Sequence, residues 1–137
     1  MILADSTFLI DAIRKEAKVK PFLLAHSDEI LFTTEVNVFE LYLGLYSIKT
    51  LENNPSLMKK RLSRLEELLF RFQILPFGRK EAIQAAKILG YLISHGKTIE
   101  FRDGVIAGIA LSNGITTILT NNLDHFSRIE GVKVITY

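Results

Sequence analysis

The N-terminal stretch MILADSTFLID, residues Met1–Asp11, decides the fold of this chain because it joins a short strand directly to a helix. The apolar run Ile2–Ala4 predicts a strand, and the polar residues Asp5–Thr7 predict a helix cap. The residues that follow predict a helix over Phe8–Arg14. A strand that passes into a helix through one capping cluster is typical of the start of a βα unit.

The same alternation of short strands and longer helices continues to the end of the chain. Apolar runs predict the strands, and apolar residues spaced three and four apart predict the helices. The other predicted strands are Ile30–Thr33, Phe72–Leu75, Thr116–Leu119 and Val132–Ile135. The other predicted helices run from Glu35 (capped by Thr34) to about Ile48, and over Ser56–Phe70, Arg79–Ser94 and Asp103–Ser112. This alternation predicts right-handed crossovers, and therefore a mostly parallel α/β sheet covered on both faces.

The length and composition indicate a compact domain. The chain has 137 residues, of which 48% are hydrophobic, and no linker or repeat divides it. We therefore expect one domain over residues 1–137. The apolar runs are too short to cross a bilayer, and acidic residues interrupt the N-terminal stretch, unlike a signal peptide. We expect a cytoplasmic protein that does not associate with membranes.

The composition also narrows the possible chemistry. The absence of cysteine excludes disulfides, thiolate zinc sites and cysteine nucleophiles. The three histidines lie far apart in the sequence, and we expect each to be a surface or loop residue and not a ligand. The net charge of +2 is mildly basic, and eight of the 17 Lys and Arg residues fall within residues 59–87. That region could attract phosphate backbones or form an ordinary solvated helix face.

Glu40 is predicted to lie on the inward-facing side of its helix. The residues of that side are Val36, Phe39, Leu43 and Ser47. A carboxylate on a buried apolar face is unfavourable unless a cation or hydrogen bonds compensate it. Gly44, one turn after Glu40, lowers helix propensity by about 1 kcal/mol relative to Ala, which suggests that another group approaches closely there. It is equally open that Glu40 reaches the rim or pairs with a basic side chain.

Asp5 and Asp103 lie at predicted helix starts, where capping alone would explain either residue. The predicted helix face of Asp103 is otherwise small and apolar, with Ile106, Ala107 and Ala110. Together with Glu40, the two aspartates offer the oxygen ligands that Mg²⁺ and Mn²⁺ prefer. A bound cation would relieve repulsion among clustered carboxylates and could activate a water for phosphate-ester hydrolysis. Spacing alone leaves open whether the three acids meet.

Four motifs in series resemble those of PIN-domain ribonucleases. They are LADSTFLID (Leu3–Asp11), TTEVNVFELYLG (Thr33–Gly44), DGVIAGIALSNG (Asp103–Gly114) and ILTNNLDHFSRIEGVKVI (Ile118–Ile135). The length and layout look like the VapC branch of the family, the toxins of toxin–antitoxin pairs. This resemblance implies a three-layer α/β/α domain with a mostly parallel five-stranded sheet. It also implies an Mg²⁺- or Mn²⁺-dependent endoribonuclease that hydrolyses RNA, forms a homodimer and binds a VapB-like antitoxin.

The resemblance implies roles for seven residues. The predicted catalytic residues and metal ligands are Asp5, Glu40 and Asp103. The residues predicted to support them are Ser6, Thr120, Asn122 and Asp124.

One departure from the family pattern concerns a fourth acid. Many members carry it two residues after the threonine of the last motif, where this chain has Asn122. Others carry an Asp directly before the phenylalanine, where this chain has His125, with Asp124 one residue earlier. Asn122 could still orient a ligand or a water, and Asp124 could partly substitute for the missing acid. The use of one or two metal ions therefore stays open.

Two other classes of protein compete with the nuclease hypothesis. A catalytically silent PIN-like module would bind RNA or a protein without cutting, and the missing fourth acid leaves room for it. A phospho-accepting receiver domain would pair adjacent acids after the first strand and place a lysine after a late strand. Because Asp5 is followed by Ser6, and Thr120 by Asn121, the sequence disfavours a receiver.

Overall fold

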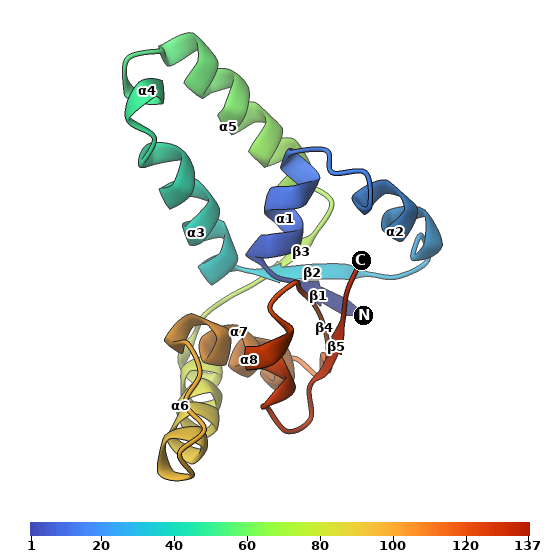
Figure 1. Ribbon diagram of the computed structural model, residues 1–137, viewed down its shortest axis with the longest axis vertical. Helices are drawn as coiled ribbons and strands as arrows, with labels where there is room; N and C mark the ends of the chain where they lie inside the picture. The colour runs from blue at the N-terminus through green and yellow to red at the C-terminus, as the bar shows by residue number, and fades with distance from the viewer.

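The computed structural model describes residues 1–137 as a sheet with helices on both faces (Figure 1). The strands are β1 (Ile2–Ala4), β2 (Leu31–Thr34), β3 (Gln73–Leu75), β4 (Thr117–Leu119) and β5 (Lys133–Ile135). The helices are α1 (Ser6–Ile13), α2 (Val19–Ala25), α3 (Glu35–Tyr46), α4 (Lys49–Glu52), α5 (Pro55–Leu69), α6 (Arg79–Ser94), α7 (Phe101–Ser112) and α8 (Leu123–Ser127). None of these helices combines the length and the apolar character that crossing a bilayer would require.

All five strands are parallel, in the order β3-β2-β1-β4-β5. The central strand β1 pairs Leu3 with Phe32 of β2 on one side and with Ile118 of β4 on the other. The chain leaves β1 toward β2 and leaves β4 toward β5. The topological switch point, where sites of such sheets form, therefore lies between the carboxyl ends of β1 and β4. The predicted parallel α/β fold is confirmed.

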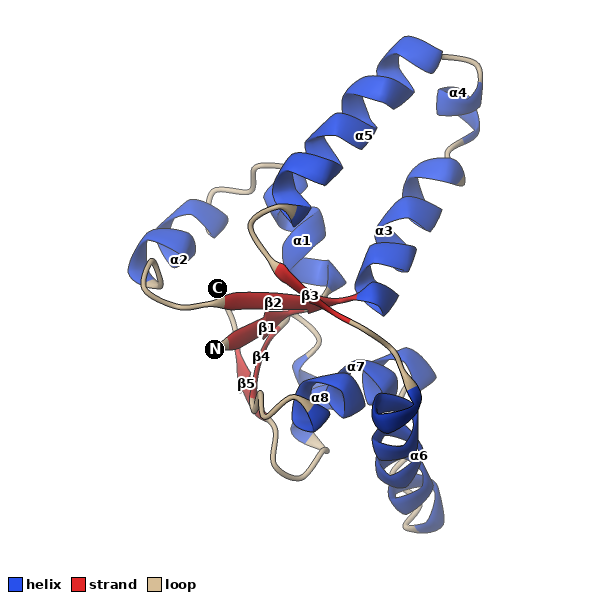
Figure 2. Cartoon of the chain, turned by 180° about the vertical axis from the view of Figure 1, so that it is seen from behind, coloured by secondary structure: helices blue, strands red, loops and turns tan.

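Each face of the sheet has its own apolar core, because successive side chains of a strand point to opposite faces. Ile2 and Ala4 pack with residues of α1, α2, α3 and α5, among them Phe8, Phe22, Leu41 and Leu65. Leu3 packs on the other face with residues of α7 and of the α8 region, among them Ile106, Ala110, Phe126 and Ile129. Figure 2 shows the two helical layers on opposite sides of the strands.

The predicted strands and long helices all occur, and their bounds differ by two residues or fewer from the predicted ones. Three short helices were not predicted. They are α2, α4 and α8, which have seven, four and five residues. Helices this short span one or two turns, so they show little apolar periodicity and depend on tertiary packing. The polar segment before β5 contains α8.

The prediction for the buried face of α3 is wrong. The side chains of Phe39 and Leu43 are 63% and 50% exposed, whereas Asn37 and Leu41 are buried. Apolar residues occur around most of α3, so periodicity did not single out the face that packs against α1 and α5. The close approach expected at Gly44 is also absent, because no atom lies within 4 Å of the position of a Cβ there.

A close approach does occur between α6 and α7. A Cβ on Gly108 would lie 2.6 Å from the Cα of Ala85, and one on Gly104 would lie 2.3 Å from the Cδ2 of Leu89. The two helices can pack this closely only because these positions lack side chains. The contact holds α7 against α6, and thereby the first turn of α7 near the end of the sheet.

The substitution Gly108→Ala should destabilise the protein. Its new methyl group meets the backbone of Ala85, so the helices must separate, and we expect a loss of about 1–3 kcal/mol in the free energy of unfolding. The matched control is Gly90→Ala on α6, where a Cβ meets nothing within 4 Å. The control should be neutral or stabilising by up to about 1 kcal/mol. Urea denaturation measures both, and equal stability of the two variants would contradict the proposed packing.

Candidate active site

A small cavity of about 140 Å³ lies at the carboxyl ends of β1 and β4, where the topology places the site of such a sheet. Its walls carry four carboxylates, those of Asp5, Glu40, Glu100 and Asp103. A single cation, Arg102, also lines it. The three acids singled out from the sequence therefore meet in one cavity, although Asp5 follows β1, Glu40 lies on α3 and Asp103 lies on α7.

Asp5 is buried and caps α1, as its position after β1 predicts. Its Oδ1 accepts hydrogen bonds from the Thr7 backbone N (2.9 Å), the Thr7 hydroxyl (2.6 Å) and, more weakly, the Phe8 backbone N (3.4 Å). Its Oδ2 accepts a hydrogen bond from the Thr120 hydroxyl at the end of β4. Burial raises the pKa of Asp5, and these hydrogen bonds oppose the rise. Capping and a place in the cavity are thus compatible roles for Asp5.

Glu40 lies on the side of α3 that faces the cavity. Its Oε2 accepts a hydrogen bond from Nη1 of Arg102 at 3.0 Å. Partial burial raises the pKa of Glu40; Arg102 opposes the rise, and the charges of Asp5 and Asp103 add to it. Glu40 therefore lines the acidic cavity and also pairs with a basic side chain, which the sequence had left open.

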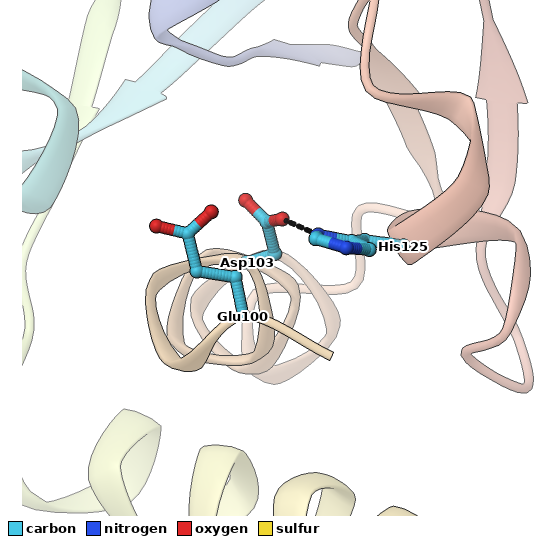
Figure 3. Close-up of side chains that lie close together, drawn as sticks. All are labelled: Glu100, Asp103 and His125. Atoms are coloured by element: carbon cyan, nitrogen blue, oxygen red, sulfur yellow. Dashed lines mark hydrogen bonds and ion pairs between the residues drawn. The ribbon is translucent and has the colours of Figure 1, made fainter. Parts of the chain in front are cut away.

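Asp103 lies in the first turn of α7, and the cap position belongs to Glu100. Its Oδ2 accepts a hydrogen bond from Nδ2 of Asn122 at 2.7 Å and lies 2.6 Å from Nδ1 of His125 (Figure 3). Burial raises the pKa of Asp103, and the contact with His125 opposes the rise. A simple capping role does not account for these contacts.

The sequence analysis did not single out three residues of the site, Glu100, Arg102 and His125. His125 departs most from its expected place. It was expected on the surface or in a loop, but it lies in α8 and contacts Asp103. One oxygen each from Glu100 and Asp103 and a ring nitrogen of His125 lie within 4.8 Å of one another, close enough to hold a metal ion (Figure 3). The departure from the family pattern directly before Phe126 was the available signal for this residue.

Three of the four predicted supporting residues lie at the cavity. Thr120 bonds Asp5, Asn122 bonds Asp103, and the hydroxyl of Ser6 accepts a hydrogen bond from Asn37 at the cavity wall. The backbone N of Asn122 also donates to the Thr120 hydroxyl at 2.8 Å, which links the two supports.

The structure does not bring the fourth, Asp124, into the cavity. Its side chain is 76% exposed and forms an ion pair with Arg128, one turn later on the same segment. Because successive residues of a helix point about 100° apart, α8 cannot direct both Asp124 and His125 to Asp103. The expected substitution of Asp124 for the missing acid has no support in this geometry.

Glu100, Asp103 and His125 have ligand atoms close enough together to hold a metal ion. Asp5 and Glu40 line the same cavity as Asp103 and add carboxylate oxygens, the ligands that hard ions prefer. The molecule is therefore an α/β domain with an acidic centre, a carboxylate-lined cavity at the switch point of its parallel sheet.

Comparison with known proteins assigns the family. The family model of the PIN domain matches residues 2–132. The chain therefore belongs to the PIN-domain family, and the resemblance carried by its four motifs is confirmed.

Individual relatives cover nearly the whole chain. Ribonuclease VapC1 of Rickettsia felis is 29% identical over 135 residues, which cover 98% of this chain and 95% of the relative. Toxin FitB of Neisseria gonorrhoeae is 30% identical over 118 residues, 85% of this chain and 84% of the relative. The crystal structure of FitAcB from Neisseria gonorrhoeae matches with a TM-score of 0.84 at 29% identity, and covers 98% of this chain and 96% of that one.

The raised pKa of Asp5 predicts how the metal-free protein responds to pH. Between the ordinary value of 3.8 and the raised value, the unfolded chain ionises Asp5 while the folded chain keeps it protonated. The folded state then binds more protons, so its stability falls as the pH rises through that range. In a chelator, the free energy of unfolding of the wild type relative to Asp5→Asn should fall as the pH rises above the ordinary value of 3.8. A difference that rises over this range would contradict the burial of Asp5.

Proposed function

We propose that this chain is a metal-dependent endoribonuclease and the toxin of a toxin–antitoxin pair, with one nuclease domain over residues 1–137. The observation that carries the proposal is the meeting of Asp5, Glu40 and Asp103 in one cavity of a PIN-domain chain. Relatives named ribonuclease and toxin along most of the chain's length support it. Because such a toxin acts on RNA, we expect it to work in the cytoplasm.

The residues present fit Mg²⁺ or Mn²⁺. Four carboxylates share the cavity with one cation, Arg102. The side chain of Arg102 is 53% exposed and forms ion pairs with both Glu40 and Glu100. This leaves excess negative charge in a partly buried space, which a divalent ion with oxygen ligands would balance. Asp5, Glu40 and Asp103 would hold the ion. When bound, it would activate a water and stabilise negative charge on the phosphate.

The chain's own residues orient these ligands. Thr120 and Thr7 hold the two oxygens of Asp5, and Asn122 holds one oxygen of Asp103. His125 Nδ1 lies beside the same oxygen of Asp103. The exposed guanidinium of Arg102 lies at the rim, where it can meet an incoming phosphate.

A second candidate function is a silent module that binds RNA or protein without cutting. Asn122 and His125, where other members carry an acid, are the observation in its favour. Because both functions use the same fold, measurements of cleavage and of metal binding are needed to separate them.

Single substitutions of the three acids should abolish RNA cleavage. We expect Asp5→Asn, Glu40→Gln and Asp103→Asn each to lower the rate with Mn²⁺ or Mg²⁺ by at least about 100-fold, because each removes a charge that would hold the ion. Cleavage of a mixed RNA pool, with a chelator as the metal-free control, measures the effect.

The matched control is Asp124→Asn, which removes an acid outside the cavity and should keep most of the activity. Full activity in any of the three variants would remove that residue from the proposed ligand set. Failure of the wild type to bind any divalent ion in a calorimetric titration would favour the silent module.

We propose two protein partners, an antitoxin and a second copy of this chain. The relatives named Ribonuclease VapC1 and Toxin FitB support an antitoxin of the VapB type. For the second copy, the support is an apolar stripe on α3, defined by Phe39, Leu43 and Tyr46, which are between 50% and 63% exposed. Large apolar side chains gathered on one exposed helix face are typical of an interface between subunits.

A charge within the apolar stripe should separate the homodimer. We expect Leu43→Lys to shift the protein to a monomer in light scattering coupled to size exclusion, because a lysine would be buried without a partner. Leu24→Lys on α2, which is also exposed, is the control and should leave the assembly unchanged. A dimer that survives Leu43→Lys at the same protein concentration would move the interface away from α3.

A further inference from the structure

The acidic cavity cannot by itself hold an RNA strand. Its volume of about 140 Å³ is well below the roughly 300 Å³ at which ligand pockets begin. Four carboxylates also repel the phosphates on either side of the bond to be cut. Since phosphate contacts with Lys and Arg supply most of the affinity for nucleic acids, a cationic surface is needed beside the cavity.

A second cavity, which we call the basic cavity, lies between α6 and the end of α8. Its volume is about 480 Å³. Three cationic side chains line it, those of Lys87, Lys97 and Arg128, against one acid, Glu130. The two cavities share no lining residue.

The cations of the basic cavity differ in how they are held. Arg128 is fixed, with Nη1 bonded to the Thr98 carbonyl oxygen and Nη2 bonded to Asp124, each at 3.0 Å. Lys87 and Lys97 are exposed, and neither has a carboxylate within ion-pair distance. Two ammonium groups are therefore free to bind phosphates.

The basic cavity also offers an aromatic surface. Tyr91 lines it, is 55% exposed, and stacks on His95 with the ring centroids 4.0 Å apart. Apolar side chains of Ile88, Leu92 and Ile129 lie beside it. Free cations next to an exposed aromatic ring are the combination that binds single-stranded nucleic acid, in which bases stack on side chains.

Two short segments connect the basic cavity to the acidic one. Lys97 and Glu100 lie three residues apart on the segment before α7, a separation of at most about 10 Å along the backbone. On α8, His125 contacts Asp103, and Arg128 lines the basic cavity three residues later. Figure 2 shows α8 beside α7, with α6 next to them.

We propose that the basic cavity binds a nucleotide of single-stranded RNA close to the bond that is cut. Lys87 and Lys97 contact the phosphates, and the base stacks on Tyr91. This inference rests on the proposed ribonuclease function and adds to it a binding site for the substrate.

Binding of a fluorescein-labelled single-stranded RNA of random sequence, measured by anisotropy in a chelator, tests the proposal without cleavage. We expect the double variant Lys87→Gln/Lys97→Gln to bind about 10-fold more weakly at moderate salt, and its affinity to depend on salt with a slope smaller by about 1.4, for two lost phosphate contacts. The matched control is Lys20→Gln/Lys49→Gln, which removes the same charge from α2 and α4. It should change the affinity by less than about 2-fold.

A second pair of variants tests the aromatic contact without a change of charge. Tyr91→Ala should weaken binding by about 5-fold or more, and Tyr91→Phe should retain it, because stacking needs the ring and not the hydroxyl. Circular dichroism confirms that both variants fold. In cleavage assays with metal, the same losses should affect KM and leave kcat nearly unchanged.

The outcomes separate this inference from the proposed function. Suppose that the wild type binds and cleaves RNA and that the double lysine variant and Tyr91→Ala bind it equally well. This result would overturn the proposed role of the basic cavity but not the ribonuclease function. Equal losses of RNA affinity in the double variant and its control would show that only the net charge matters, which would also overturn the role of the basic cavity. A wild type that neither binds nor cleaves RNA would overturn both.

Discussion

A carboxylate at the end of a central, buried strand loses its water, so the protein itself must supply its hydrogen bonds. For Asp5 these come from two places, the first turn of α1 and the Thr120 hydroxyl at the end of β4. The same set of bonds starts the first helix and joins the two strands at the topological switch point. The position and angle of α1 and of the residues after β4 therefore depend on one buried acid, and the cavity forms around it.

Glu40 and Asp103 are placed near Asp5 by helix packing that involves no acidic residue. Gly104 and Gly108 let α7 lie against α6, and this contact carries Asp103 to the carboxyl end of the sheet. Glu40 arrives from the opposite layer on α3. Burial raises the pKa of Glu40 and of Asp103 because it disfavours their charged forms, and Arg102 and His125 oppose the rise. Burying several carboxylates together lowers the stability of the fold, as is expected of a site that binds a cation.

The surface has two cavities of opposite charge, and each has a different role. The acidic one is small enough for an ion and water, whereas the basic one is larger and combines cations with an aromatic ring. An enzyme gains from such a division, since binding energy from parts of the substrate away from the reacting bond can position that bond. The short helix α8 belongs to both, with His125 on the acidic side and Arg128 on the basic side. The apolar stripe of α3 is a third feature and points to a contact with another protein chain.

The sequence by itself determined the order of the strands and long helices, their bounds to within two residues and the parallel sheet, and it singled out the three acids that the tertiary structure brings into one cavity. These follow from local patterns, namely apolar periods, caps and residues placed directly after strands. Only the tertiary structure decided that Phe39 and Leu43 face outward, that α8 exists, that His125 contacts Asp103, and that Asp124 turns away. Each of these depends on contacts between residues distant in the chain: an apolar helix shows which residues can be buried, but the neighbours that pack against it determine which ones are.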